Sequence, residues 1–190
     1  MTADPKSALR RTLRARRRAL AAAQGDAAHA AAEHLPLHRL PAFATYGGYH
    51  AMGSELDPSP LIRRLGATGA TFALPCAVAA DAPLDFRTWD PDDLLVPDAV
   101  GVPSPPPHAA AVHPDLVIVP LLGFDRRGGR LGQGGGHYDR TLENLRSFKP
   151  VFALGLAFAG QEVDDLPLET HDQRLDATLT ETGYIEVGKD

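Results

Sequence analysis

A glycine-rich segment carries the strongest chemical signal in this 190-residue sequence. Residues 123–140 contain seven glycines, four arginines and two aspartates. Glycines packed this densely let backbone N–H groups converge on one point, because no Cβ blocks the approach. Converging N–H groups beside arginines make a binding site for phosphate. A helix expected to begin near His137 would add its positive end to the same point. The segment therefore predicts binding of a nucleotide or another phosphorylated ligand.

Two well-known phosphate-binding motifs do not fit this segment. A Walker loop needs a lysine and then Ser or Thr after its last glycine, whereas Gly136 is followed by His137 and Tyr138. The dinucleotide fingerprint needs a third glycine at the position of His137. A glycine cluster alone also fits a tight surface turn. The choice between a turn and a binding loop therefore depends on residues elsewhere in the chain.

Charged residues at two other places support a binding cleft. Lys6 and Arg10 lie four residues apart and share one face of a predicted helix, where they fit a phosphate clamp or a solvated amphipathic face. Glu55 follows Met52-Gly53-Ser54 at the end of a predicted strand, before Asp57, a candidate N-cap of the next helix. Ligands of open α/β sheets bind at the carboxyl ends of strands. We therefore expect Glu55 and the glycine-rich segment, which also follows a strand, to face one cleft.

Alternating helical and apolar patterns predict the architecture. Helices are expected at 5–23, 26–35, 57–65 and 138–146. Strands are expected at 43–50, 70–74, 84–89, 116–119 and 151–156, with one or two short edge strands within 175–187. This alternation indicates an α/β fold, a single three-layer α/β/α sandwich with a mostly parallel sheet, in one domain over 1–190. Pro75 is expected to stop its strand, and the proline-rich stretch 91–114 to supply no central strand.

Composition narrows the classes of function. The single Cys76 excludes a disulfide framework and a cysteine-based zinc site. No apolar stretch approaches the roughly 20 residues of a membrane helix. The net charge of −5 argues against nucleic acid as a partner, although arginines crowd the N-terminus. We expect a cytoplasmic protein that binds small molecules, with no nucleic-acid or membrane partner, as a monomer or weak homodimer.

Motifs spread along the whole chain resemble those of a known enzyme family. In order they are Lys6-x-x-Leu9-Arg10, Glu55-x-Asp57, Pro120-x-x-Gly123-Phe124-Asp125, Arg130-Leu131-Gly132-x-Gly134-Gly135-Gly136-x-Tyr138-Asp139-Arg140 and His171-Asp172-x-x-x-Asp176. The sequence is similar to 5-formyltetrahydrofolate cyclo-ligases, also called 5,10-methenyltetrahydrofolate synthetases. The glycine loop followed by Tyr-Asp-Arg is the most specific part of the resemblance. It implies a ligase that uses ATP and Mg²⁺ to cyclise a reduced folate, through phosphorylation of the formyl oxygen and with release of ADP and phosphate.

The resemblance also implies a role for each site residue. ATP would be bound by Lys6, Arg10, Arg130, Leu131, Gly132, Gln133, Gly134, Gly135, Gly136, His137 and Tyr138. The folate would contact Glu55, Gln133, Gly134, Gly135, Gly136 and His137. Lys6, Arg130 and Tyr138 would be catalytic, and Asp139 and Asp172 would lie on the metal side. Asp125 and Arg140 are candidates for a pair that supports the loop, or for purely structural roles.

One departure from the family pattern leaves alternatives open. His137 stands where the family mostly has a tyrosine; an imidazole keeps a flat face but titrates near neutrality. A paralogue acting on another formylated or pterin-like substrate therefore remains an alternative. A module that binds a nucleotide or folate without catalysis is a second one, which the full set of charged residues disfavours.

Overall fold

A mostly parallel sheet forms the centre of the protein in this computed structural model, which describes residues 5–188. Within them, eight strands pair in the order β12-β11-β10-β7-β1-β2-β3-β6. They are β1 (Thr45–Gly47), β2 (Thr71–Ala77), β3 (Leu84–Thr88), β6 (Ala111–Val112), β7 (Leu116–Pro120), β10 (Phe152–Leu156), β11 (Ala177–Thr180) and β12 (Gly183–Glu186). The central strands β11, β10, β7, β1 and β2 pair in parallel with their neighbours in this series. The pairs β12 with β11, β2 with β3 and β3 with β6 are antiparallel. The predicted fold class is confirmed.

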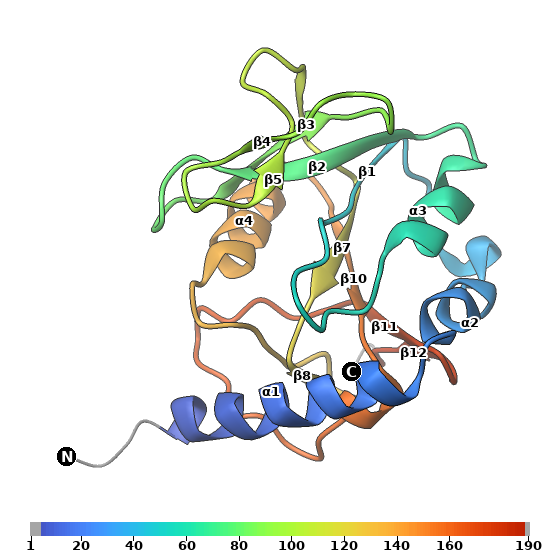
Figure 1. Ribbon diagram of the computed structural model, residues 1–190, viewed down its shortest axis with the longest axis vertical. Coiled ribbons are helices and arrows are strands. Elements are labelled where there is room, and N and C mark those ends of the chain that lie inside the picture. The colour runs from blue at the N-terminus through green and yellow to red at the C-terminus, as the bar shows by residue number, and fades with distance from the viewer. Residues whose placement is uncertain (1–4, 189–190) are drawn as a thin grey trace.

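Strand β7 lies in the middle of this sheet because both of its faces are apolar. Leu116 and Ile118 join one core cluster, and Val117 and Val119 join another on the opposite face. Helices α2 (Ala27–Glu33) and α3 (Ser59–Gly66) pack on the first face, and α4 (His137–Arg146) packs on the second. Figure 1 shows these helices on either side of the strands. The arrangement is the predicted three-layer sandwich.

Helix α1 (Pro5–Ala23) lies apart from both helix layers, across the end of the sheet (Figure 1). Its Leu13 approaches Gly123, where an added Cβ would lie 2.7 Å from Leu13 Cδ1. Its Leu20 approaches Gly160 in the short helix η2 (Ala159–Gln161) in the same way, at 2.8 Å. Gly123 follows β7 and Gly160 follows β10. Helix α1 therefore covers the carboxyl ends of the central parallel strands.

Small elements complete the fold, and one expectation is corrected. Hairpin β8 (Gly123–Phe124) with β9 (Arg130–Leu131), ribbon β4 (Val96–Pro97) with β5 (Pro103–Ser104), and η1 (Leu37–Arg39) were not predicted. The prediction that Pro75 stops its strand is wrong, since β2 continues to Ala77. Pro75 lies past the last β1 partner, Gly47↔Ala73, and pairs only with Phe86 of β3, so no ladder toward β1 is interrupted. The stretch 91–114 supplies the edge strand β6 and the ribbon. It supplies no central strand, as expected.

None of the helices formed by residues 5–188 combines the length and the apolar character that a membrane crossing requires.

Candidate functional site

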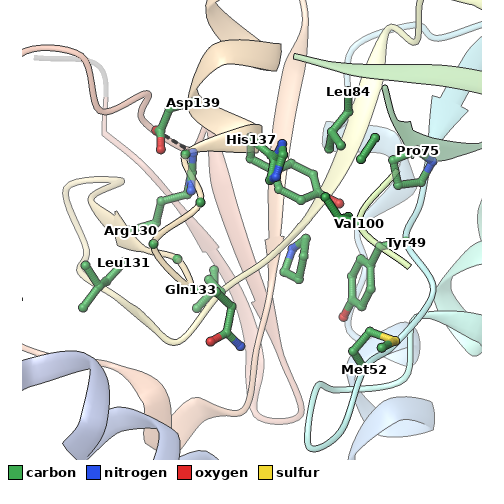
Figure 2. Close-up of a pocket in the computed structure, with 18 of the residues that line it drawn as sticks. Tyr49, Met52, Pro75, Leu84, Val100, Arg130, Leu131, Gln133, His137 and Asp139 are labelled. Carbon is green, nitrogen blue, oxygen red and sulfur yellow. Dashed lines mark hydrogen bonds and ion pairs between the residues drawn. The ribbon is translucent and has the colours of Figure 1, made fainter. Parts of the chain in front are cut away.

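A cavity of about 540 Å³ lies between the glycine-rich segment, the loop after β1, helix α1 and the segment 98–102. All of the residues predicted to bind ATP, folate or metal line this one cavity. Figure 2 shows Arg130 and Asp139 at one end, with Pro75, Leu84 and Val100 at the other. The expectation that Glu55 and the glycine-rich segment share a cleft is therefore met. The ligand that each residue binds stays a prediction.

The glycine-rich segment adopts a backbone conformation that other residues would strain. Gly134 has φ of 112°, and Gly136, the N-cap of α4, has φ of 66°. A Cβ on Gly136 would also lie 2.7 Å from Arg140 Nη1, whose guanidinium donates to the Gly135 carbonyl through Nη2 at 2.7 Å. The turn therefore leads directly into α4, so the unpaired N–H groups of the first helical turn point toward the cavity end of the segment.

Arg130 is a buried cation, and its Nε makes no hydrogen bond within residues 5–188. Its Nη2 donates to Asp139 Oδ1 at 2.6 Å, and the same oxygen accepts the Gln173 N–H at 2.9 Å. Burial lowers the pKa of Arg130, and the carboxylates of Asp139 and Asp172 oppose that shift. Its Nε is buried and finds no hydrogen-bond partner within residues 5–188. A buried donor without an acceptor is costly, and the Arg130 side chain also lines the cavity.

One face of α1 contacts the cavity at four-residue intervals. Lys6 Nζ lies 2.8 Å from Asp172 Oδ2, Arg10 Nε donates to the Gly132 carbonyl at 3.2 Å, and Arg14 holds Gln133 by two hydrogen bonds of 2.8 and 2.9 Å. Burial acts to lower the pKa of Lys6, but the hydrogen bond and charge of Asp172, aided by Glu169, raise it. The helix therefore brings cations to the glycine-rich segment, as the spacing of Lys6 and Arg10 predicts.

Glu55 is held from two sides at the opposite wall of the cavity. Its Oε2 accepts the Met52 N–H at 2.9 Å, and its Oε1 lies 3.5 Å from Arg17 Nη1. Burial raises the pKa of both Tyr49 and Tyr138, and the negative charge of Glu55 raises them further. Both phenols therefore keep their protons at neutral pH. Tyr49 donates its proton to the Leu56 carbonyl, whereas Tyr138 can donate a hydrogen bond beside this carboxylate.

The predicted metal side contains carboxylates suited to a hard cation. Asp139 and Asp172 both line the cavity, and both act on Arg130 electrostatically. Hydrogen bonds and the charge of Lys6 lower the pKa of Asp172 despite its burial, which keeps it ionised. Glu169, His171 and Asp172 also bring one potential ligand atom each within 4.8 Å of one another, with Lys6 3.3 Å from Glu169 Oε2. Carboxylate oxygens are the ligands that Mg²⁺ prefers, so the residues fit this ion.

Of the two roles left open for Asp125 and Arg140, the structure supports the purely structural one. Asp125 and Arg140 do not pair. Asp125 Oδ1 accepts the N–H groups of Arg127 and Gly129 within its own hairpin, both at 2.9 Å. Arg140 instead binds carbonyls, including that of Gly135. Each side chain stabilises the turn nearest to it in sequence.

Several cavity residues were not predicted. Asp98 accepts the N–H groups of Ala77 and Val100, both at 2.9 Å, and so fixes the segment that places Val100 at the cavity. Tyr49 lines the same cavity. No motif marks the segment 98–102, because its position depends on long-range contacts with β2. His137, the departure from the family pattern, lines the cavity and places Nδ1 3.2 Å from the Ala82 carbonyl oxygen.

Comparison with known proteins gives a consistent result. The profile of the 5-formyltetrahydrofolate cyclo-ligase family matches residues 2–181. The 5-formyltetrahydrofolate cyclo-ligase of Escherichia coli K12 is 36% identical over 148 residues, covering 75% of this chain and 78% of the relative. That of Mycolicibacterium smegmatis is 32% identical over 143 residues, covering 72% and 73%.

Two solved structures share the fold. A 5,10-methenyltetrahydrofolate synthetase from Mycoplasma pneumoniae aligns with a TM-score of 0.72 at 22% identity, covering 94% of this chain and 99% of the other. The 5,10-methenyltetrahydrofolate synthetase of Aquifex aeolicus aligns with a TM-score of 0.71 at 24% identity, covering 97% and 94%. At these identities the likeness supports the three-layer architecture.

Proposed function

Since the chain belongs to the 5-formyltetrahydrofolate cyclo-ligase family, we propose that it converts 5-formyltetrahydrofolate to 5,10-methenyltetrahydrofolate with ATP and Mg²⁺, releasing ADP and phosphate. Family membership makes it a ligase of folate one-carbon metabolism. The proposed use of ATP and the proposed mechanism rest on one shared cavity. The buried Arg130, the glycine-rich segment and Glu55 all line it. Its volume of about 540 Å³ is in the range of small-molecule sites.

The reaction requires activation of an amide. The formyl group on the 5-nitrogen of the folate is an amide, and its oxygen is a poor leaving group. Transfer of the γ-phosphoryl group of ATP to that oxygen gives a phosphorylated imidate. The 10-nitrogen then attacks the activated carbon and loses its proton. The new C–N bond closes a five-membered ring, and the C–O bond breaks with departure of phosphate. A protein assists such a step mainly by positioning both substrates and neutralising charge.

The residues divide between the two substrates. Lys6, Arg10 and the segment from Arg130 to Tyr138 surround the end of the cavity where donors collect, and there we place the triphosphate. The guanidinium of Arg130, which lines the cavity, would donate to a phosphate oxygen. Glu55 would accept hydrogen bonds from the folate, with Gln133 to His137 bordering both ligands. Tyr138, whose pKa burial raises, would donate its phenolic proton as a hydrogen bond.

Asp139 and Asp172 are the residues that would hold Mg²⁺, which on binding neutralises charge on the phosphate oxygens. Each carboxylate already has a cationic neighbour, Arg130 and Lys6 respectively. These pairs orient the two carboxylates. We further propose action in the cytoplasm on small molecules only, without nucleic acid or membrane, as a monomer or weak homodimer.

Absorbance spectroscopy tests the proposed reaction, because methenyltetrahydrofolate absorbs in the near ultraviolet and its 5-formyl precursor does not. Purified protein should produce this band only when 5-formyltetrahydrofolate, ATP and Mg²⁺ are all present, with one ADP released per product. Product formed without ATP hydrolysis would contradict the mechanism. Because His137 replaces a residue that borders the folate, turnover of another formylated pterin but not of 5-formyltetrahydrofolate would favour the paralogue.

A further inference from the structure

Arg17 is a buried cation that does not line the cavity. Only 5% of its surface is exposed, and it lies on the same helix as Lys6 and Arg10, two turns or more further along. Burial lowers its pKa, and the charge of Glu55 opposes that shift. A buried guanidinium is costly unless its donors are paired. Its partners therefore show what it stabilises.

The Arg17 guanidinium joins helix α1 to the segment after β7 and to the loop after β1. Its Nη1 donates to the Leu121 carbonyl at 3.3 Å, just after β7, and its Nε donates to Ser54 Oγ at 3.2 Å, in the loop after β1. The Leu121 carbonyl is itself fixed by Gln161 Nε2 at 2.9 Å. Because the guanidinium is planar and its donors diverge in a fixed fork, these contacts set its orientation.

The same fork faces Glu55, the carboxylate that we assign to the folate. Arg17 Nη1 lies 3.5 Å from Glu55 Oε1, while the other Glu55 oxygen accepts the Met52 N–H. The Glu55 side chain is only 10% exposed, yet it lines the cavity. Its two oxygens are therefore restrained from opposite sides, one by the loop that carries it and one by helix α1.

We propose that Arg17 is a positioning residue for folate: it fixes the Glu55 carboxylate in the orientation in which it meets the substrate. The inference rests on the proposed function, which assigns Glu55 to the folate. Folate recognition then depends on a residue outside the cavity, because the Arg17–Glu55 ion pair is anchored to the end of β7. ATP contacts, which lie with Arg130 and Lys6, are independent of this pair.

Steady-state kinetics of purified variants tests the proposal. We expect Arg17→Met to raise the KM for 5-formyltetrahydrofolate about tenfold to thirtyfold, the loss typical of a hydrogen bond to a charged group. The KM for ATP should change less than about twofold. Arg17→Lys keeps the charge without the fork and should give an intermediate folate KM. Arg16→Gln, an exposed neighbour on the same helix, is the matched control and should behave as wild type.

A double-mutant cycle with Glu55→Gln separates positioning from a general structural role. If Arg17 acts through Glu55, adding Arg17→Met to Glu55→Gln should raise the folate KM by no more than about twofold further. Independent, multiplying effects of the two changes would overturn the proposal, as would equal increases in both KM values. Should Arg17→Met not fold, the cycle is run with Arg17→Lys. Failure of wild type to cyclise the folate would instead refute the proposed function itself.

Discussion

Arg130 and Asp139 form an ion pair across the glycine-rich segment, with Arg130 Nη2 donating to Asp139 Oδ1 at 2.6 Å. The pair links β9 to the first turn of α4, so the five residues between Leu131 and His137 are held at both ends. The same Asp139 oxygen accepts the Gln173 N–H. One carboxylate thus joins the glycine-rich segment to the segment that carries Asp172.

Replacing Arg130 should weaken ATP binding selectively. Arg130→Ala removes the buried donor that we assign to a phosphate oxygen, and we expect the KM for ATP to rise about tenfold or more. The KM for folate should rise less than about threefold. Initial rates measured against each substrate in turn give both values. Arg63→Ala, an exposed arginine on α3, is the control, and equal loss of both substrates would contradict the assignment.

Replacing Glu55 should have the opposite pattern. Glu55→Ala removes the carboxylate on the folate side, so folate binding should weaken about tenfold while ATP affinity stays nearly intact. Equilibrium titration with each ligand checks this without depending on turnover. Glu33→Ala at the exposed end of α2 is the comparison. A fall in ATP affinity as large as that in folate affinity would show that the two subsites are not separate.

The loop conformation itself should depend on Gly136. Gly136→Ala places a Cβ at φ of 66° and 2.7 Å from Arg140 Nη1, which should cost about 1–2 kcal/mol and lower the Tm by about 4 °C. ATP affinity should fall because the N–H groups move. Gly25→Ala is the matched control, since nothing lies within 4 Å of its added Cβ. Thermal unfolding and ATP titration measure the two effects; an unchanged ATP affinity at lower Tm would contradict a binding role for this turn.

The fold and the composition of the cavity could be predicted because local patterns determine them. The apolar run of β7 and the periodic helices predict the layers, and the glycine-rich segment predicts its own turn. What the patterns missed has two sources: strand pairing and long-range contacts for Pro75 and Arg17, and the choice of a local partner for Asp125. Pro75 continues its strand because β1 has already ended there. Asp125 caps its hairpin rather than pairing with Arg140. The role of Arg17 depends on contacts with residues 37 and 104 positions away, which no local spacing indicates.

Asp115 should make the stability of the fold depend on acid pH. Its Oδ2 accepts the N–H groups of Ala44 and Thr45, at 2.8 and 3.0 Å, and its Oδ1 lies 2.6 Å from Lys149 Nζ. Burial acts to raise the pKa of Asp115, but these hydrogen bonds and the charge of Lys149 lower it below its usual 3.8. The unfolded chain therefore binds the proton more readily. The stabilisation is fully present above about pH 3.8 and is lost as the pH falls through the lower folded pKa.

Comparison of Asp115→Asn with wild type measures this contribution. At pH 7 the variant should have a lower free energy of unfolding in urea, because it lacks the charge that Lys149 and the two N–H groups stabilise. As the pH falls below 3.8 the difference should shrink, since wild-type Asp115 becomes neutral too. Asp92→Asn, at an exposed position, should show no such convergence. A difference between Asp115→Asn and wild type that stays constant down to the acid transition would mean that the carboxylate contributes through shape rather than charge.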